Sequence, residues 1–179
     1  MDITTIGIIA AIIILAGLGA LKASGAVSDG TGVYQPSGKN AYDDLFQKYG
    51  AAYNIDWMLI KAVCWQESSF NPNAINPSDP SYGLMQIQHN PNGWSTALAY
   101  GKKLNINFSK LPDDLYNPEL SIRIGGAFIA EIVKKYGNQA IDIYNIGETS
   151  YNRGNRNRIY RDSVLNKYNE LITKGSYIL

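Results

Sequence analysis

The first pattern along the chain is an uncharged, largely apolar run from Ile3 to Leu21. At about 1.5 Å per residue in a helix, a run of this length can cross a hydrocarbon core about 30 Å thick. We therefore predict a transmembrane anchor within residues 1–22. A cleaved signal peptide is the alternative, with Ser24 and Ala26 as the small residues before the cut. Against it, no Lys or Arg precedes the run, and the run is longer than a usual signal core.

Beyond this run the pattern changes to a polar stretch and then to helical periodicity. Residues 23–40 are rich in Gly and Ser and predict a flexible linker. From residue 41 apolar residues recur at three- and four-residue steps, the spacing of amphipathic helices. Helices are predicted over residues 41–53, 56–68, 94–104, 117–136, 139–145 and 155–173. Only residues 84–88 and the turn before them look strand-like, so residues 41–179 should form one mainly α domain with a small β element.

Two details of this pattern predict packing. The Gly125-Gly126 pair inside the long helix indicates close approach of another backbone. The last helix should turn four apolar residues inward. These are Ile159, Leu165, Tyr168 and Ile172.

One acid continues a buried stripe. Asp56 is placed to cap the helix that follows it, and Leu59 and Val63 lie on one face of that helix. Glu67 lies four residues beyond Val63 on the same face. A carboxyl group in apolar surroundings is harder to ionise, so the pKa of Glu67 should rise, which suits a general acid. The alternative is a solvated helix-terminal Glu or one paired with a surface Lys.

Composition narrows the function classes. The formal net charge is +1, so the chain has no strong positive electrostatic field that would attract nucleic acid. Cys64 is the only cysteine, so no internal disulfide can form, and its apolar position indicates a packed thiol. His89 is the only histidine and is interpreted as an ordinary loop residue, with a place at the edge of a site as the alternative. Without a second His or a Cys pair, no zinc site is expected.

A group of arginines lies near the C-terminus. We interpret them mainly as the solvated face of the last helix, with contact to an anionic polymer as the minor alternative. They are Arg153, Arg156, Arg158 and Arg161.

Four short motifs follow one another along the chain. They read E-S-S-F-N-P from Glu67, G-L-M-Q from Gly83, N-P-E-L from Asn117 running on to G-G-A-F from Gly125, and Y-N-I-G from Tyr144. Together, and in this order, they resemble the catalytic region of the soluble lytic transglycosylase (SLT) family. That family consists of lysozyme-like enzymes that cleave the glycan strands of bacterial peptidoglycan.

The resemblance implies a lysozyme-like α+β fold, no cofactor, and peptidoglycan glycan strands as the substrate. It implies that Glu67 is the acid and then the base that cuts the β-1,4 bond between N-acetylmuramic acid and N-acetylglucosamine. The substrate's own acetamido and 6-hydroxyl groups replace a second carboxylate, giving 1,6-anhydro-muramic ends. Tyr144 is expected to lie near Glu67 and orient it. The residues expected to contact the sugars are Ser68, Tyr82, Met85, Gln86, Tyr144 and Asn145.

Two other functions compete with this one. A goose-type lysozyme shares E-S and G-L-M-Q motifs but adds water, and it would use a carboxylate in the intervening loop, where Asp79 lies. Asp in P-S-D-P is also a common turn residue. A catalytically inactive wall-binding structural protein is the third possibility, but such a protein has no use for a buried acid.

The cellular setting follows from the apolar run. Lys22 is its only basic flank and would favour a cytoplasmic location for the catalytic domain, away from peptidoglycan. With the small size of the catalytic region, this favours a bacteriophage particle whose enzyme opens the wall locally during infection. The expected location is then a virion membrane or tail, and otherwise the periplasmic face of the bacterial inner membrane. Expected partners are glycan strands, a lipid membrane through residues 3–21, and other virion or envelope proteins.

Overall fold

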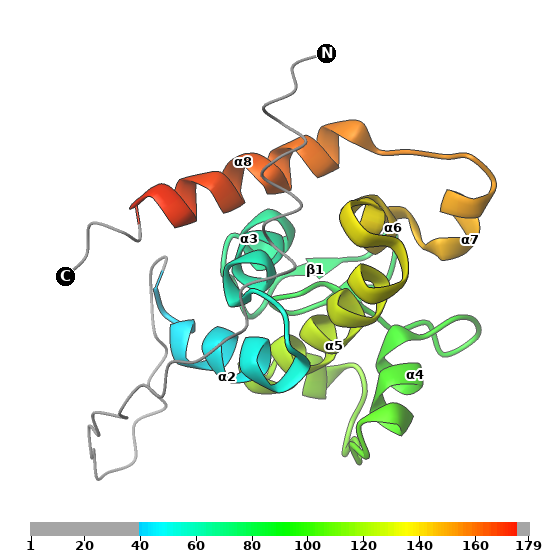
Figure 1. Ribbon diagram of the computed structural model, residues 1–179. Helices are drawn as coiled ribbons and strands as arrows, with labels where there is room; N and C mark the ends of the chain where they lie inside the picture. The colour runs from blue at the N-terminus through cyan, green and yellow to red at the C-terminus, as the bar shows by residue number, and fades with distance from the viewer. Residues whose placement is uncertain (1–39, 175–179) are drawn as a thin grey trace, which may run out of the picture.

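The computed structural model describes residues 40–174, which form a mainly helical domain with one small sheet (Figure 1). The helices are α2 (Asp43–Tyr53), α3 (Trp57–Ser68), α4 (Thr96–Lys103), α5 (Pro118–Tyr136), α6 (Ala140–Ile146), α7 (Glu148–Asn152) and α8 (Arg158–Lys174). Short 3-10 helices, η1 (Asp113–Tyr116) and η2 (Gly137–Gln139), precede α5 and α6. The prediction of a mainly α fold with a small β element is confirmed.

The predicted anchor, residues 3–21, lies outside the described residues, as does the predicted linker apart from Asn40. Within residues 40–174, no helix has both the length and the apolar character needed to cross a bilayer.

The helices begin where side chains can bind free backbone amides. The Asp56 carboxylate accepts a hydrogen bond from the Met58 amide at 2.9 Å, and the Asn117 side chain accepts one from the Leu120 amide at 3.0 Å. Pro118 occupies the first turn of α5, where a missing N–H costs nothing. These starts were predicted from sequence because a capping residue acts only within its own turn.

The strands of the sheet are shorter than predicted and lie at different residues. Strands β1 (Ile75–Asn76), β2 (Ser81–Tyr82) and β3 (Ile87–Gln88) pair antiparallel in that order, with Tyr82 opposite both Ile75 and Ile87. The prediction of a strand over residues 84–88 is therefore wrong for its first three residues. Gly83 has φ +73 and Gln86 has φ +45, and such left-handed residues bend the chain into a turn instead of extending it.

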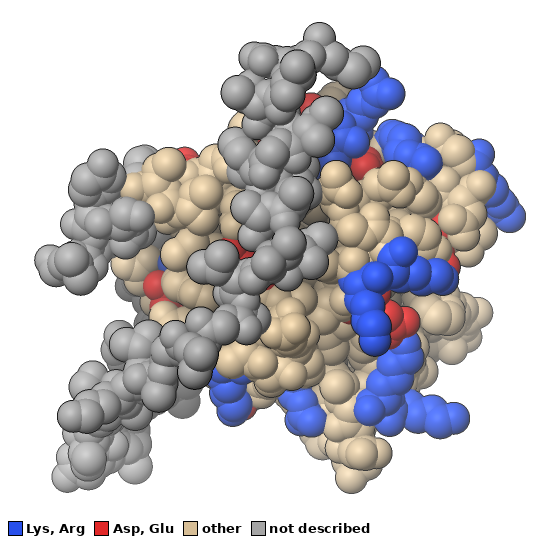
Figure 2. Space-filling view, viewed as in Figure 1, with Lys and Arg blue, Asp and Glu red and all other residues tan. Residues whose placement is uncertain are grey.

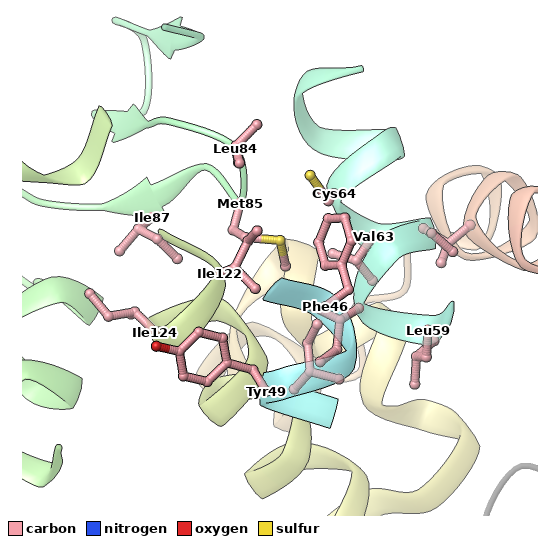
Figure 3. Packing of buried hydrophobic residues seen from close by; sticks show 14 of the residues in the cluster. Phe46, Tyr49, Leu59, Val63, Cys64, Leu84, Met85, Ile87, Ile122 and Ile124 are labelled. Atoms are coloured by element: carbon pink, nitrogen blue, oxygen red, sulfur yellow. The ribbon is translucent and has the colours of Figure 1, made fainter. Parts of the chain in front are cut away.

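The core forms where α2, α3 and α5 meet the segment that joins β2 to β3. Helix α5 lies at the centre of the domain, with α2 and α6 packed against it (Figure 1). Figure 3 shows the buried side chains of these elements in contact around Met85. Each such large apolar side chain contributes about 1.5–3 kcal/mol when fully buried. The turn that carries the G-L-M-Q motif is therefore anchored in the core.

Helix α8 packs along α3 and closes the domain. Its inward face consists of Tyr160, Val164 and Tyr168, at four-residue steps. The prediction that Ile159 faces inward is wrong, because its side chain is 86% exposed. Ile159 precedes Tyr160 by one residue, and a helix turns about 100° per residue, which carries Ile159 off the buried face. Helix α7 was not predicted, since its five residues are too few to show a period.

Candidate active site

Glu67 lies in the last turn of α3, and its carboxyl group is surrounded mainly by protein. The stripe of Leu59, Ile60 and Val63 that precedes it is buried, as predicted. Burial raises the pKa of Glu67 from its ordinary value of 4.5 to about 7, while a hydrogen bond from Tyr160 acts in the opposite direction. Glu67 can therefore be protonated or ionised near neutral pH.

The direct partner of Glu67 is Tyr160 of α8, which was not predicted. The Tyr160 hydroxyl donates a hydrogen bond to Glu67 Oε1, although the two residues are 93 positions apart. Tyr160 is buried, and burial together with the nearby Glu67 carboxylate raises the pKa of its hydroxyl well above 10. The spacing of Tyr160 to Val164 could have placed it on the inward face of α8. No sequence signal identifies its partner.

Tyr144 of α6 lies near the acid but uses its hydroxyl elsewhere. That hydroxyl donates to the Met85 carbonyl at 2.8 Å, and the ring packs on Phe128 with 5.2 Å between centroids. Burial is the main cause that raises the pKa of Tyr144 well above 10, and the charge of Glu67 is the next. Tyr144 thus joins the Y-N-I-G motif to the G-L-M-Q turn beside Glu67.

Met85 occupies the core instead of an accessible surface. Its side chain is 0% exposed, and its amide donates to Ser121 Oγ at 3.0 Å. A Cβ added at Gly125 would lie 2.8 Å from Met85 Cβ. The expectation that the Met85 side chain contacts the sugars is therefore not met. We predicted that another backbone approaches the Gly125-Gly126 pair closely. At Gly125 the neighbour is instead a side chain, that of Met85.

Gly83 fixes the start of this turn. A Cβ added there would lie 2.1 Å from the Leu115 carbonyl oxygen, and its φ of +73 is one that other residues rarely adopt. Gln86 ends the turn, and its side-chain amide donates to the Gly83 carbonyl at 3.0 Å. Tyr82, just before the turn, packs edge-on against Tyr116 at 6.0 Å between centroids. Gln86 and Tyr82 are both partly exposed and so can still contact a ligand.

The remaining predicted binding residues lie at two helix ends. The Ser68 hydroxyl donates to the Cys64 carbonyl at 3.2 Å at the end of α3, one residue from Glu67. Asn145 is exposed near the end of α6, and its side-chain oxygen accepts a hydrogen bond from Asn157 Nδ2 at 2.8 Å. Asn157 Oδ1 also accepts from the Tyr160 amide at 3.1 Å, so it connects Asn145 to the first turn of α8.

Asp79 and His89 have other local partners. Asp79 is exposed in the hairpin between β1 and β2, and its carboxylate accepts a hydrogen bond from Gln88 Nε2 at 2.7 Å. His89 Nδ1 and the Ser95 hydroxyl share a hydrogen bond at 2.9 Å. Cys64 is fully buried, and burial raises the pKa of its thiol. No group of His, Cys, Asp or Glu that could hold a metal ion occurs among residues 40–174.

The chain is similar to several known proteins. It is 32% identical over 114 residues to the soluble lytic murein transglycosylase of Escherichia coli strain K12, a match that covers 64% of this chain and 16% of that protein. It is also 32% identical over 119 residues to the peptidoglycan transglycosylase gp16 of Escherichia phage T7, covering 64% of this chain and 8% of that protein. The chain therefore spans less than a fifth of the length of either relative.

The fold is similar to that of a solved relative. The crystal structure of the 70 kDa soluble lytic transglycosylase of Escherichia coli matches with a TM-score of 0.59 and 28% identity, over 72% of this chain and 23% of that one. The sequence profile described as "Transglycosylase SLT domain" matches residues 44–165, which include Glu67, the G-L-M-Q turn, Tyr144 and Tyr160. Since that match covers most of the sequence, the chain belongs to the transglycosylase SLT domain family.

Proposed function

We propose that this protein is a peptidoglycan lytic transglycosylase in which Glu67 acts first as acid and then as base. The observation that carries the proposal is the state of Glu67, enclosed by protein, hydrogen-bonded by Tyr160 and with a pKa of about 7. A group with a pKa near the working pH can both give and accept a proton. Similarity to proteins named as murein and peptidoglycan transglycosylases supports the choice of substrate.

The proposed reaction begins with protonated Glu67. It gives its proton to the oxygen of the β-1,4 bond between N-acetylmuramic acid and N-acetylglucosamine, and that bond breaks to leave an oxocarbenium-like muramic residue. The acetamido group of the same residue stabilises this cation. The 6-hydroxyl group then closes on C1 while the Glu67 carboxylate takes the hydroxyl proton, so Glu67 is restored, no water is consumed, and a 1,6-anhydro end forms.

The neighbours of Glu67 have distinct proposed roles. Tyr160 stabilises the carboxylate formed after the first proton transfer, because its hydroxyl donates to that oxygen. Met85 contributes its carbonyl, which holds Tyr144, while its side chain anchors the turn in the core. The proposed contacts to the sugars come from Ser68, Tyr82, Gln86, Tyr144 and Asn145.

Asp79 distinguishes this reaction from hydrolysis. Glycosidases that add water usually hold a second carboxylate beside the sugar. Asp79 is exposed, and its carboxylate is bonded to Gln88 in the hairpin. We infer that Asp79 shapes this turn and takes no part in the bond cleavage.

The test compares two matched amide variants of the full chain on purified sacculi. Glu67→Gln should lose wall lysis by about 10² to 10⁴ in rate, because the amide fits the same space but cannot deliver a proton. Asp79→Asn should keep its activity, and products of the wild-type protein should lack the mass of one water relative to reducing-end muropeptides. Reducing ends together with an inactive Asp79→Asn protein would establish a goose-type hydrolase. Full clearing by Glu67→Gln would exclude the proposed role of Glu67, and an inert wild-type protein would leave only wall binding.

We also propose that the protein is anchored in a membrane through residues 3–21 and opens the wall locally during phage infection. Support comes from the uncharged apolar run and from the similarity to the phage T7 protein. The intact chain should co-purify with virions and partition into detergent. Recovery solely as a soluble periplasmic protein that begins near Val27 would show instead that residues 3–21 are a cleaved signal peptide.

A further inference from the structure

A second buried acid lies on α6, two residues before Tyr144. It is Asp142, which is 1% exposed in the first turn of this helix. Its Oδ2 atom accepts a hydrogen bond from the Arg161 guanidinium of α8 at 3.2 Å, while its buried Oδ1 atom has no hydrogen-bond partner within residues 40–174. A charged side chain is costly to bury, and a buried ion pair adds little net stability. The pair of Asp142 with Arg161 therefore indicates a role other than stability.

Arg161 is less exposed than the solvated helix face predicted for it. Figure 2 shows basic side chains at the surface around the start of α8. The Arg161 side chain is only 30% exposed, and it pairs with two carboxylates. One is buried Asp142 of α6, and the other is exposed Asp162 of α8 itself, at 3.4 Å. Of these two pairs, the one with Asp142 joins two helices.

The ion pair lies directly beside the residue that contacts the acid. Arg161 follows Tyr160 along α8, and the Tyr160 hydroxyl bonds Glu67 of α3. A helix turns about 100° per residue, so rotation of α8 about its axis moves both side chains together. Tyr160 has to point toward α3 while Arg161 points toward α6. Two fixed directions on adjacent residues restrict that rotation.

Two other side chains hold this part of the chain, and each lies three residues from Tyr160. Asn157 contacts the end of α6, and Ser163 contacts α3. Neither is adjacent to Tyr160, whereas Arg161 is. The pair of Asp142 with Arg161 is therefore the side-chain link to α6 that lies closer to Tyr160 along the chain.

We propose that Asp142 is a positioning residue that acts through Arg161 and holds α8 in the orientation at which Tyr160 meets Glu67. The proposal rests on the proposed function, since that function makes Glu67 the acid and base. Loss of Asp142 should weaken the hydrogen bond from Tyr160 to Glu67. Because that hydrogen bond lowers the pKa of Glu67, its loss should raise this pKa further.

The direction of the change separates positioning from a simple effect of charge. Removal of the negative charge of Asp142 would by itself make Glu67 easier to ionise and so lower its pKa. A weaker bond from Tyr160 acts in the opposite direction. Tyr144 of α6 and Cys64 of α3 also interact with the charge of Glu67, but burial raises the pKa of each above its ordinary value. Both therefore stay uncharged at pH 7 and do not reverse the sign.

The experiment measures the pKa of Glu67 in the full chain in nonionic detergent. Carbon-13 NMR follows its carboxyl carbon against pH, and the Glu67→Gln protein identifies the signal. The test variant is Asp142→Ala. Asp142→Asn removes the same charge but keeps an oxygen that Arg161 can bond. Asp162→Ala is the matched control, because it removes the exposed carboxylate partner of the same arginine.

Asp142→Ala should raise the pKa of Glu67 by about 0.5–1 unit, the net contribution of one hydrogen bond. Asp142→Asn and Asp162→Ala should stay at the wild-type value or slightly below it. In a Tyr160→Phe protein, Asp142→Ala should cause no further rise, because the bond through which it acts is already absent. A fall or no change in Asp142→Ala would overturn the proposal, as would an equal rise in Asp162→Ala or a further rise in the Tyr160→Phe protein.

A second variant applies if Asp142→Ala does not fold. Asp142→Asn with Arg161→Met removes the contact between α6 and α8 without leaving a buried charge alone, and it should show the same rise. An unchanged pKa in this folded double variant would refute the proposal.

Failure of the proposed function is separately visible, because the NMR measurement needs no catalysis. An inactive wild-type chain would exclude lytic activity, while a raised pKa in Asp142→Ala would still establish the positioning of Tyr160. In an active protein, the alkaline limb of kcat/KM against pH should move up together with the pKa from NMR. Activity of the wild type with an unchanged pKa in a folded Asp142→Ala protein would refute the role of Asp142 alone.

Discussion

Two opposing effects act on the carboxyl group of Glu67. Burial favours its protonated form, whereas the hydrogen bond from the Tyr160 hydroxyl favours its charged form. Burial is the larger effect, and the resulting pKa is about 7. A change of one unit in the pKa corresponds to about 1.36 kcal/mol between the two protonation states. A variant that removes either effect should therefore show a measurable shift in the pKa of Glu67.

Tyr160→Phe should move the alkaline limb of the pH–rate profile to higher pH. The change removes a hydrogen bond that lowers the pKa of Glu67, so the acid should stay protonated to a higher pH. Its activity below the limb should also fall, since the carboxylate that forms during bond cleavage loses a donor. Tyr168→Phe is the matched control, because Tyr168 also lies on α8 but bonds Asp56 at 2.6 Å. An unshifted limb in Tyr160→Phe, measured as kcat/KM against pH, would contradict this assignment.

Glu67→Gln should be more stable than the wild type at alkaline pH. The folded-state pKa of about 7 lies above the ordinary 4.5, so the folded protein holds the proton more tightly than the unfolded chain. This tighter binding adds about 3 kcal/mol to the free energy of unfolding. The contribution is complete below about pH 4.5 and is lost as the pH rises through 7. Urea unfolding should show that, from pH 5 to pH 8, the free energy of unfolding of the wild type decreases relative to that of Glu67→Gln. If the difference in the free energy of unfolding between the two proteins were the same at both pH values, the pKa of Glu67 would not be raised by folding.

Among the secondary-structure elements, the first turn of α8 has a role beyond packing. Asn157 binds the Tyr160 amide with one side-chain atom and Asn145 with the other. The start of α8 is thereby joined to the end of α6, which carries Tyr144. This single residue positions the turn that brings Tyr160 to Glu67.

Asn157→Ala should destabilise the domain by about 1 kcal/mol and lower kcat, because the Tyr160 amide in the first turn of α8 loses its acceptor. Asn157→Ser should recover most of the stability, since Ser caps a helix about as well as Asn, but its short side chain should not bridge to Asn145. Thermal unfolding and steady-state kinetics of both variants provide the comparison. If Asn157→Ala matched the wild type in both, Asn157 would have no positioning role.

Helix α5 is shaped to receive the turn that carries Gln86. Gly125→Ala should cost about 1–3 kcal/mol by overpacking against Met85, whose amide is held by Ser121, and should lower activity by shifting that turn. Gly126→Ala is the matched control. Its added Cβ would meet side-chain atoms at 3.3 Å or more, and Ala is the better helix former by about 1 kcal/mol. Equal effects of the two changes, by unfolding and by kinetics, would argue against a special role for Gly125.

Across the whole molecule, polar contacts join the helix that carries the acid to two neighbouring helices. Gln66 Oε1 accepts hydrogen bonds from Ser163 at 2.6 Å and from Lys167 at 2.9 Å, so α3 and α8 are held together beside the contact of Glu67 with Tyr160. Helices α2 and α3 are joined by buried Lys61, which pairs with Asp43 at 2.6 Å. These contacts between helices lie within residues 40–174.

A protein that begins at Asn40 should fold cooperatively and cleave soluble glycan strands at the rate of the full chain. Its boundary is chosen because Lys61 Nζ also donates to Asn40 Oδ1 at 3.1 Å. Asp43→Ala in the same protein is the comparison, since loss of one partner of a buried ion pair costs about 3–5 kcal/mol. Circular dichroism melting and activity assays would decide. An unfolded or inactive protein beginning at Asn40 would show that residues 1–39 take part in the domain.

The sequence by itself determined the features that depend on neighbouring residues. Asp56 and Asn117 cap their helices through amides two and three residues away, and the apolar steps before Glu67 place it at the end of a buried stripe. Because helix capping and periodicity act within a few turns, the mainly α fold and the raised pKa of Glu67 could be predicted without coordinates. The four ordered motifs supplied the family.

Only the tertiary structure decided which distant groups meet. Tyr160 reaches Glu67 across 93 positions, and periodicity could indicate that Tyr160 faces inward but not what it touches. The same is true of Met85, whose side chain occupies the space left by Gly125, and of Tyr144, whose hydroxyl bonds the Met85 carbonyl. Local patterns specify the direction of a side chain relative to its own element. The partner depends on how elements pack, and the whole core fixes that packing at once.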